Sequence, residues 1–179
     1  LNEPEGIVKG DGGWGKMCSW NEMRSFLKAC ASTIHRSDRS RLVSVGGGEY
    51  ALQKGYYLGL GLDFFDYHIY TDNVNLTPVQ DIRRKWFKRR LANRKELNAP
   101  ILIGEFGQNN GPNARSDDEL QRRVTVDVFR NVKNKGYAGA LIWSYEWPGA
   151  PTKEWDRLLR GNGDSSWRPA AFELQKFKF

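Results

Sequence analysis

The stretch Ile101-Leu102-Ile103-Gly104-Glu105-Phe106-Gly107 constrains the fold more than any other part of the sequence. Three consecutive branched apolar residues are typical of a short strand that is buried on both faces, as in parallel sheets covered by helices. Glu105 follows where the apolar run ends, between glycines and before a polar loop. The pattern predicts an acid that the strand holds at a fixed point. The alternative is an ordinary surface glutamate at a strand end.

Strand-like runs alternate with helical patterns along the whole chain. Further strands are predicted at 42–45, 64–70 and 138–144, and helices at 19–35, 77–98, 116–135 and from about Pro169. Capping boxes at Ser19, Thr77 and Ser116 predict where the first three helices begin. This alternation predicts a parallel α/β architecture. A doubly wound sheet has the same pattern, but no glycine-rich phosphate loop follows any strand. The residues suited to chemistry lie at the carboxyl ends of strands, which favours a barrel.

A second acid stands near the start of the chain, in Asn2-Glu3-Pro4. Two carboxylates on separate elements are typical of acid/base or nucleophilic catalysis on one substrate. In the strand predicted at 64–70, His68 and Tyr70 share one face because side chains alternate along a strand. The glycines Gly46-Gly47-Gly48 follow the strand predicted at 42–45, and we expect them to let the backbone approach another group closely.

Four motifs occur in order: Asn2-Glu3-Pro4, His68-Ile69-Tyr70, the stretch 104–107 and Trp143. Together they resemble the retaining glycoside hydrolases of clan A, most nearly family five with its β-mannanases and endoglucanases. The resemblance implies a (β/α)8 TIM barrel of which residues 1–179 are the C-terminal part of one catalytic domain. In that family Asn-Glu-Pro closes the fourth strand, so strands one to four are expected before Leu1. A complete barrel takes about 250 residues.

The resemblance also implies roles for the motif residues. Glu3 is expected to be the acid/base and Glu105 the nucleophile of a double displacement, with their carboxyl groups about 5 to 5.5 Å apart. Asn2 is expected to bind the sugar 2-hydroxyl. The implied activity is hydrolysis of a β-1,4-linked mannan or glucan. No metal or cofactor is expected, because a retaining mechanism needs none and the histidines and cysteines form no recognisable ligand set.

Three aromatic or imidazole side chains complete the implied site. Tyr70 is expected to donate a hydrogen bond to the nucleophile, which favours the charged carboxylate. His68 is expected to line the substrate site, and Trp143 to stack on a sugar ring, with Trp14 and Trp147 as candidates to extend that surface. The alternative for His68 and Tyr70 is a partly buried strand with satisfied polar tips, and tryptophan is often a core residue.

The net charge of +7 restricts the partners. Much of the basic excess lies in the predicted helix 77–98, whose apolar residues keep a helical spacing: Val79, Ile82, Trp86, Phe87 and Leu91. We interpret the charges as the solvated side of a barrel-covering helix. Clustered Arg and Lys also suit phosphates, but no nucleic-acid motif accompanies them, and no run is long enough to span a membrane.

The resemblance implies a β-linked oligo- or polysaccharide as the substrate partner. The open edges of a half-barrel sheet predict a further partner, either a second copy of the chain or an N-terminal half-barrel. The sequon Asn75-Leu76-Thr77 is compatible with a secreted, extracellular protein, whose targeting segment would lie upstream. Two other functions stay open: a non-catalytic carbohydrate-binding remnant of a barrel, and a basic interaction module.

Overall fold

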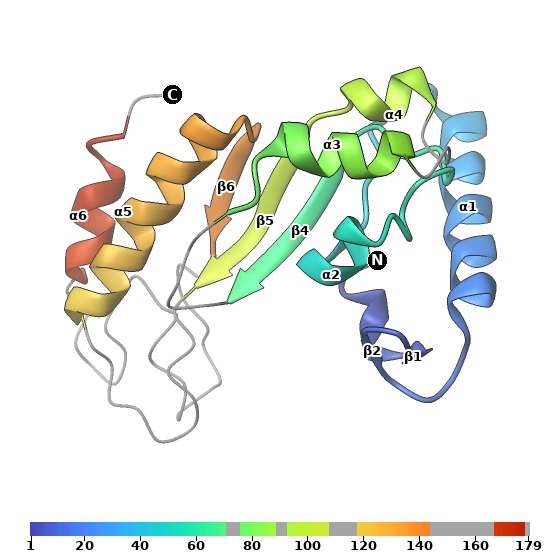
Figure 1. The fold of residues 1–179 in the computed structure, drawn as a ribbon, viewed down its shortest axis with the longest axis horizontal. Helices are drawn as coiled ribbons and strands as arrows, with labels where there is room; N and C mark the ends of the chain where they lie inside the picture. The colour runs from blue at the N-terminus through green and yellow to red at the C-terminus, as the bar shows by residue number, and fades with distance from the viewer. Residues whose placement is uncertain (71–75, 89–92, 108–117, 144–166, 178–179) are drawn as a thin grey trace. The chain divides into compact units, whose positions relative to one another are not determined.

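A computed structural model describes residues 1–70, 76–88, 93–107, 118–143 and 167–177. Its sheet has four parallel strands in the order β3-β4-β5-β6, namely Gly46–Gly48, Phe65–Tyr70, Ile101–Gly107 and Gly139–Ile142. Figure 1 labels the last three of these strands. The parallel sheet and its helices confirm the predicted α/β class. Within the described ranges, no helix is both long and apolar enough to cross a membrane.

The chain divides into two compact units. The first unit comprises Leu1–His68 and Thr77–Leu102, and the second comprises Ile69–Leu76 and Ile103–Phe179. Strands β4 and β5 each begin in the first unit and end in the second. Each unit therefore contains one end of both strands.

The longest helix of the first unit is α1, which spans Trp20–Ser37. It begins with the predicted capping box, in which the Ser19 side chain accepts from the Glu22 N–H and the Glu22 carboxylate accepts from the Ser19 N–H. The Glu22 carboxylate accepts hydrogen bonds from the Ser19 N–H and from the Ser19 hydroxyl, and these two bonds, the backbone one first, lower the pKa of Glu22. The buried residues of α1 recur at helical spacing: Trp20, Met23, Leu27 and Ala31. The Trp20 ring stacks on Tyr56 at 4.3 Å between ring centroids.

The strand predicted at 42–45 is wrong, because the ladder starts later, at β3. Residues Gly46, Gly47 and Gly48 pair in parallel with Asp66, Tyr67 and His68 of β4. Upstream, the Val43 N–H donates to the Asp63 carboxylate and the Ser44 hydroxyl to the Phe64 carbonyl. Side-chain acceptors and donors thus take the place of a regular ladder in this segment.

The first unit also contains several short elements. They are the 3-10 helix η1 (Pro4–Gly6), the antiparallel pair β1 (Lys9–Gly10) and β2 (Gly13–Trp14), and the helix α2 (Glu49–Gln53). Asn2 forms an isolated parallel bridge with Gly46, which attaches the start of the chain to β3.

The helix predicted at 77–98 is two helices, α3 (Val79–Lys88) and α4 (Arg94–Asn98). The second begins anew because Asn93 forms its own capping box with Glu96, and an extended N-cap residue cannot lie inside a continuous helix. Helix α3 buries Val79, Ile82 and Trp86, whereas Phe87 is 71% exposed, so its place on the apolar face was wrong. Leu91 and Asn75 lie outside the described residues.

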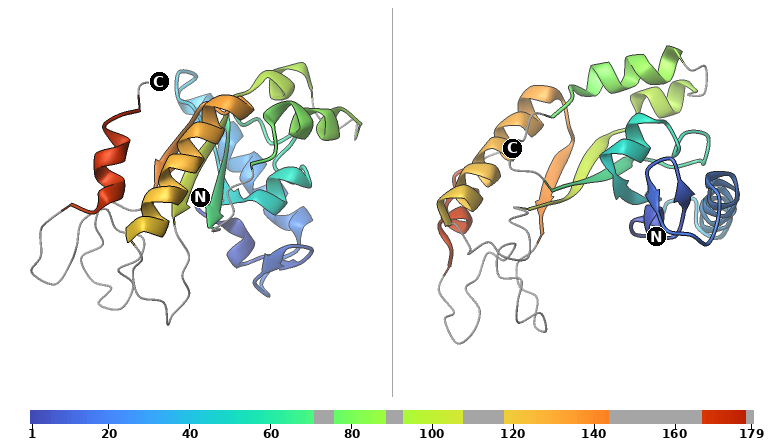
Figure 2. Two further views of the ribbon diagram at one scale, coloured as in Figure 1. Left: turned by 60° about the vertical axis from the view of Figure 1, so that its left-hand side comes forward. Right: turned by 60° about the horizontal axis from the view of Figure 1, so that its bottom comes forward.

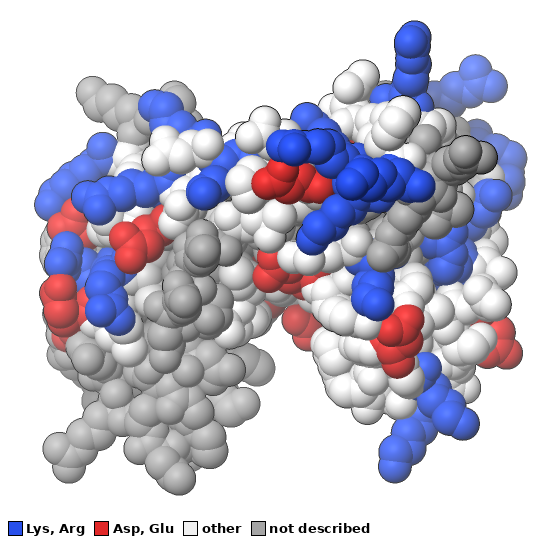
Figure 3. Space-filling view, viewed as in Figure 1, with Lys and Arg blue, Asp and Glu red and all other residues white. Residues whose placement is uncertain are grey.

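The polar side of α3 is the solvated face that the sequence predicts. Arg84, Lys85 and Lys88 are exposed, and Arg84 pairs with Asp81. Figure 3 shows Lys and Arg gathered over this helix. Arg83 instead turns inward and donates to the carbonyl of Ala99, which joins α3 to the residues before β5.

The second unit places two helices side by side, α5 (Asp118–Lys135) and α6 (Pro169–Leu174) (Figure 2). Phe106 of β5 packs edge-on against Phe129 of α5, with ring centroids 5.6 Å apart. Ala170 and Ala171 of α6 are buried against Ile142 of β6. The serine predicted to cap α5, Ser116, lies outside the described residues.

Candidate active site

Glu3 occupies a backbone conformation that is unusual for a residue with a side chain. Its φ of 43° and ψ of 62° lie in the left-handed region, which costs a non-glycine residue about 1 kcal/mol. Two backbone hydrogen bonds hold it there: the Glu3 N–H donates to the Gly46 carbonyl at 2.7 Å, and its own carbonyl accepts from the Gly6 N–H at 3.0 Å. The chain thus orients Glu3 through β3 and η1.

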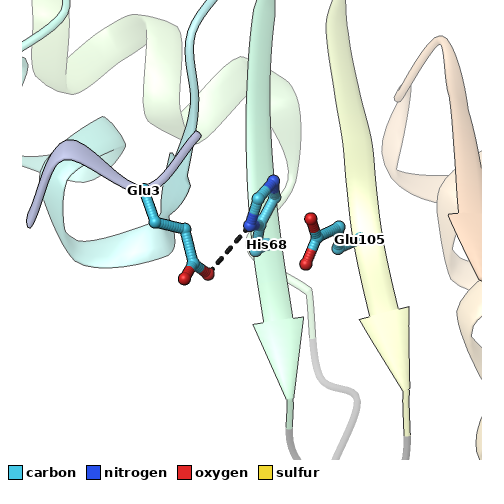
Figure 4. A group of neighbouring side chains, drawn as sticks. All are labelled: Glu3, His68 and Glu105. Atoms are coloured by element: carbon cyan, nitrogen blue, oxygen red, sulfur yellow. Dashed lines mark hydrogen bonds and ion pairs between the residues drawn. The ribbon is translucent and has the colours of Figure 1, made fainter. Parts of the chain in front are cut away.

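The carboxylate of Glu3 meets His68 (Figure 4). Nδ1 of His68 lies 2.9 Å from Oε1 of Glu3, within hydrogen-bond distance. The His68 side chain is only 4% exposed, while that of Glu3 is 36% exposed. The structure therefore brings these two predicted residues together, with the imidazole buried and the acid reaching solvent.

The glycines of β3 make this arrangement possible. A Cβ at Gly46 would lie 2.7 Å from Nε2 of His68 and 3.1 Å from Oδ1 of Asn2. A Cβ at Gly47 would collide with the Tyr57 hydroxyl. The close approach expected of these glycines is confirmed, and the approaching groups are side chains of the first unit.

Asn2 precedes Glu3 and is exposed. Its bridge to Gly46 fixes its backbone, and its side-chain oxygen lies beside the same glycine that borders His68. Asn2, Glu3 and His68 thus gather around Gly46.

In the second unit, Tyr70 and Glu105 form a second pair. The Tyr70 hydroxyl donates to Oε2 of Glu105 at 2.8 Å, and both residues are partly buried. A Cβ at Gly107 would lie 3.2 Å from Cε1 of Tyr70. The last glycine of the Gly-Glu-Phe-Gly stretch therefore leaves room for the tyrosine ring.

Trp143 follows β6 directly. The backbone N–H of Trp143 donates to the Phe106 carbonyl at 2.8 Å. A Cβ at Gly107 would lie 2.8 Å from the backbone carbonyl oxygen of Trp143. Trp143 is 38% exposed, so part of it is open to solvent. Of the two candidate extensions, Trp14 is 61% exposed on β2, and Trp147 lies outside the described residues.

A buried acid next to Glu3 was missed in the sequence. Glu5 is 1% exposed, and its Oε1 accepts from the Tyr57 hydroxyl at 2.6 Å and from the Gly48 N–H at 2.8 Å. The available signal was weak: an acid between Pro4 and Gly6, directly after the motif with Glu3. An acid so near a polar motif is usually solvated, and the partners of Glu5 in its buried position, Tyr57 and Gly48, are distant in the sequence.

Comparison with known proteins identifies the family. The sequence model of the cellulase family (glycosyl hydrolase family 5) matches residues 1–147. The chain belongs to glycosyl hydrolase family 5. The match covers all six predicted site residues of this family 5 chain. A search of the curated proteins found no match.

Solved structures of glycoside hydrolases are similar to this family 5 chain. The endo-1,4-beta-mannanase from Rhizomucor miehei is 20% identical with a TM-score of 0.53, and the match covers 80% of this chain and 43% of the mannanase. The endo-1,4-beta-mannanase from Eisenia fetida is 22% identical with a TM-score of 0.49, and the match covers 80% of this chain and 45% of that enzyme. The β-glucuronidase from Ruminococcus gnavus in complex with D-glucuronic acid is 16% identical with a TM-score of 0.65. That match covers 98% of this chain and 31% of the glucuronidase.

The matched part of the family 5 chain thus covers less than half of the length of each of these enzymes. A four-stranded parallel α/β sheet that matches part of larger glycoside hydrolases agrees with a partial TIM barrel.

Proposed function

We propose that this chain carries the two catalytic carboxylates of a retaining β-glycanase, with Glu105 as the nucleophile. The carrying observation is the hydrogen bond from Tyr70 to Glu105, found in a chain that matches the cellulase family over residues 1–147. A donor to a carboxylate favours its charged form. The nucleophile must be charged when it attacks the anomeric carbon.

Glu3 is the acid/base in this proposal. In the first step Glu105 bonds to the anomeric carbon, the glycosidic bond breaks, and Glu3 gives its proton to the leaving oxygen. In the second step Glu3 takes a proton from water, and the resulting hydroxide displaces Glu105. The exposure of Glu3 supports access of that water, and its bond to His68 supports a fixed side-chain direction. Asn2 is proposed to bind the sugar 2-hydroxyl.

The proposed substrate is a β-1,4-linked mannan or glucan. The cellulase family description and the fold shared with the Rhizomucor miehei mannanase support this class of polymer. The partly exposed Trp143 is proposed as the sugar platform, because an aromatic face binds the apolar face of a pyranose ring. A polymer of this kind is met outside the cell, so we propose that the protein is secreted.

The proposal includes a partner, either a second copy of the chain or an N-terminal half-barrel. The matched mannanases are more than twice as long as the part that this chain covers, which supports the need for further strands in catalysis.

The test is incubation with mannan, glucan and their oligosaccharides, with and without candidate partners. The anomeric proton signals of the first products are followed by NMR. We expect β-configured products, and Glu105→Ala should abolish them. Initial release of the α-anomer would contradict the retaining mechanism.

A second candidate is the non-catalytic carbohydrate-binding remnant, which the partial coverage of the mannanases favours. It predicts oligosaccharide binding without turnover under every condition. Calorimetry distinguishes the two, because binding by a remnant should persist in Glu105→Ala and weaken in Trp143→Ala.

A further inference from the structure

Glu5 is a buried carboxylate that the proposed reaction does not use. It lies in η1, two residues after Glu3, with 1% of its surface exposed. Its Oε1 accepts two hydrogen bonds, from the Tyr57 hydroxyl at 2.6 Å and from the Gly48 N–H at 2.8 Å. These donors come from positions 52 and 43 residues away in the sequence.

This arrangement carries an energetic cost. Oε2 of Glu5 is buried and has no hydrogen-bond partner among the described residues. An unsatisfied buried polar atom typically costs about 1–3 kcal/mol, and more when it is charged. Burial first, and then the charge of Glu5, raise the pKa of Tyr57, so the phenol stays a neutral donor. Stability alone therefore explains Glu5 poorly, since an apolar residue would avoid the cost.

The contacts of Glu5 connect directly to the backbone that orients Glu3. Glu5 binds one end of β3 through Gly48, and Glu3 binds the other end through the Gly46 carbonyl. Gly47, between them, leaves the space that the Tyr57 hydroxyl occupies. The short strand and η1 are thus joined twice, and Glu3 has its strained φ of 43° within that loop.

We propose that Glu5 is a positioning residue, which with Tyr57 clamps η1 onto β3 and so holds the Glu3 carboxylate against His68. Its value for catalysis rests on the proposed function. The effect on the Glu3–His68 pair does not, and it is measurable in a chain without turnover.

The test uses the imidazole signals of the chain itself. The sequence contains two histidines, His35 and His68, so two Hε1 signals are expected in the NMR spectrum, and His35→Gln assigns them. His35 is the internal control, because it pairs with Asp63 and not with Glu3. All spectra are recorded at one pH.

Three variants distinguish position from charge. Glu5→Ala removes the acceptor, and Tyr57→Phe removes one donor without leaving a large cavity. Glu5→Gln keeps an oxygen acceptor but removes the charge. We expect Glu5→Ala to shift the His68 signal, and Tyr57→Phe to shift it less. In Glu5→Gln the His68 signal should stay at its position in the unaltered chain. The His35 signal should not move in any of the three variants. Glu49→Ala, which removes another acid beside β3, should leave both signals unchanged.

The proposal is overturned if the His68 signal is unmoved in folded Tyr57→Phe and Glu5→Ala. It is equally overturned if Glu5→Gln moves the signal as far as Glu5→Ala, since charge would then be the cause. If Glu5→Ala fails to fold by circular dichroism, Tyr57→Phe and Glu5→Gln decide. Where hydrolysis is measurable, Glu5→Ala should lower kcat more than it changes KM, and failure of hydrolysis in the unaltered chain leaves the NMR result standing.

Discussion

The Tyr70 hydroxyl donates a 2.8 Å hydrogen bond to Oε2 of Glu105, from the end of β4 to β5. This bond connects two sequence motifs that lie 35 residues apart. It restricts the rotation of a glutamate side chain, which otherwise samples many conformers. The acid and its donor therefore act as one unit, and removing either should change the other.

Tyr70→Phe should lower the rate of hydrolysis by about 10- to 100-fold, with a small effect on KM. The change removes one hydrogen bond to a charged group, worth about 1.5–3 kcal/mol, and each 1.36 kcal/mol corresponds to a factor of ten in rate. Steady-state kinetics on a soluble oligosaccharide measures the effect. Tyr56→Phe is the matched control, because Tyr56 uses its ring to stack on Trp20. An unchanged rate in Tyr70→Phe would show that the bond has no role in turnover.

Replacing the two acids should have different consequences on activated substrates. Glu105→Ala should abolish turnover of aryl glycosides and polysaccharide alike, because the attacking group is lost. Glu3→Ala should spare glycosides with good leaving groups, which need little protonation. Parallel assays with nitrophenyl glycosides and polysaccharide test this. Equal losses on both substrates would contradict the acid role of Glu3.

Sequence patterns predicted the elements whose own side chains carry a clear strand or helix signal. Strands β4 and β5 were found because aromatic and β-branched residues fill them, and the capping box at Ser19 marked the start of α1. Strand β3 was displaced to 42–45, because three glycines give no strand signal and the ladder there depends on β4. The capping box at Asn93, which begins α4, was not predicted, because it lies in a charged run that was interpreted as one continuous helix.

The candidate site shows the same division. The residues of the pairs Glu3–His68 and Tyr70–Glu105 were named from their motifs. The resemblance also implied the hydrogen bond from Tyr70 to Glu105, whereas the contact between Glu3 and His68 came from the structure alone. Glu5 was not named, because its burial depends on Tyr57, whose position follows from tertiary packing and not from any local pattern.

The ion pairs of Asp63 should make part of the stability depend on acid pH. Burial would raise the pKa of this carboxyl, but hydrogen bonds from the Val43 N–H, Lys95 and His35 outweigh it and lower the pKa. The folded state thus holds Asp63 charged more firmly than the unfolded chain. This stabilisation is complete above the unfolded pKa of about 3.9 and is lost as the pH falls through the lower, folded value.

Asp63→Asn should therefore lower the melting temperature by a few degrees at pH 6, and the difference from the unaltered chain should shrink below about pH 4. Thermal melts followed by circular dichroism between pH 2 and 7 measure this. Asp38→Asn is the surface comparison. Hydrogen bonds from the Ser40 hydroxyl and N–H also lower the pKa of Asp38, but this carboxyl is exposed, so we expect a smaller loss than in Asp63→Asn. A difference that persists unchanged at the lowest pH would show that charge is not the cause.

Adjacent glycines of β3 should respond differently to the same substitution. Gly47→Ala should destabilise the fold by about 1–3 kcal/mol, as overpacking does, because the new methyl group meets the Tyr57 hydroxyl and Glu5. In Gly48→Ala the methyl group would lie 3.7 Å from Oε1 of Glu5, an ordinary contact. That variant should change stability by less than about 0.5 kcal/mol. Urea titrations compare the two, and equal stabilities would refute the tight packing at Gly47.

The isolated chain should associate in solution. Among the described strands, β6 is an outer member of the sheet and its Leu141 is 58% exposed, whereas the outer edge of β3 is bridged by Asn2. Unpaired strand edges and apolar side chains favour pairing with another copy. Light scattering should give a mass above the 20.6 kDa of one chain. A stable monomer that binds no hydrophobic dye would contradict this expectation.

If Glu3 has the proposed acid/base role, its left-handed backbone makes stability and reactivity favour different residues at a single position. Aspartate tolerates this conformation better than glutamate does, so Glu3→Asp would relax the chain. The same change shortens the side chain by one methylene and withdraws the carboxyl group from His68. Selection for stability therefore favours aspartate at position 3, whereas selection for proton transfer at the proposed site favours glutamate. A screen for thermal resistance alone would recover variants that have lost activity.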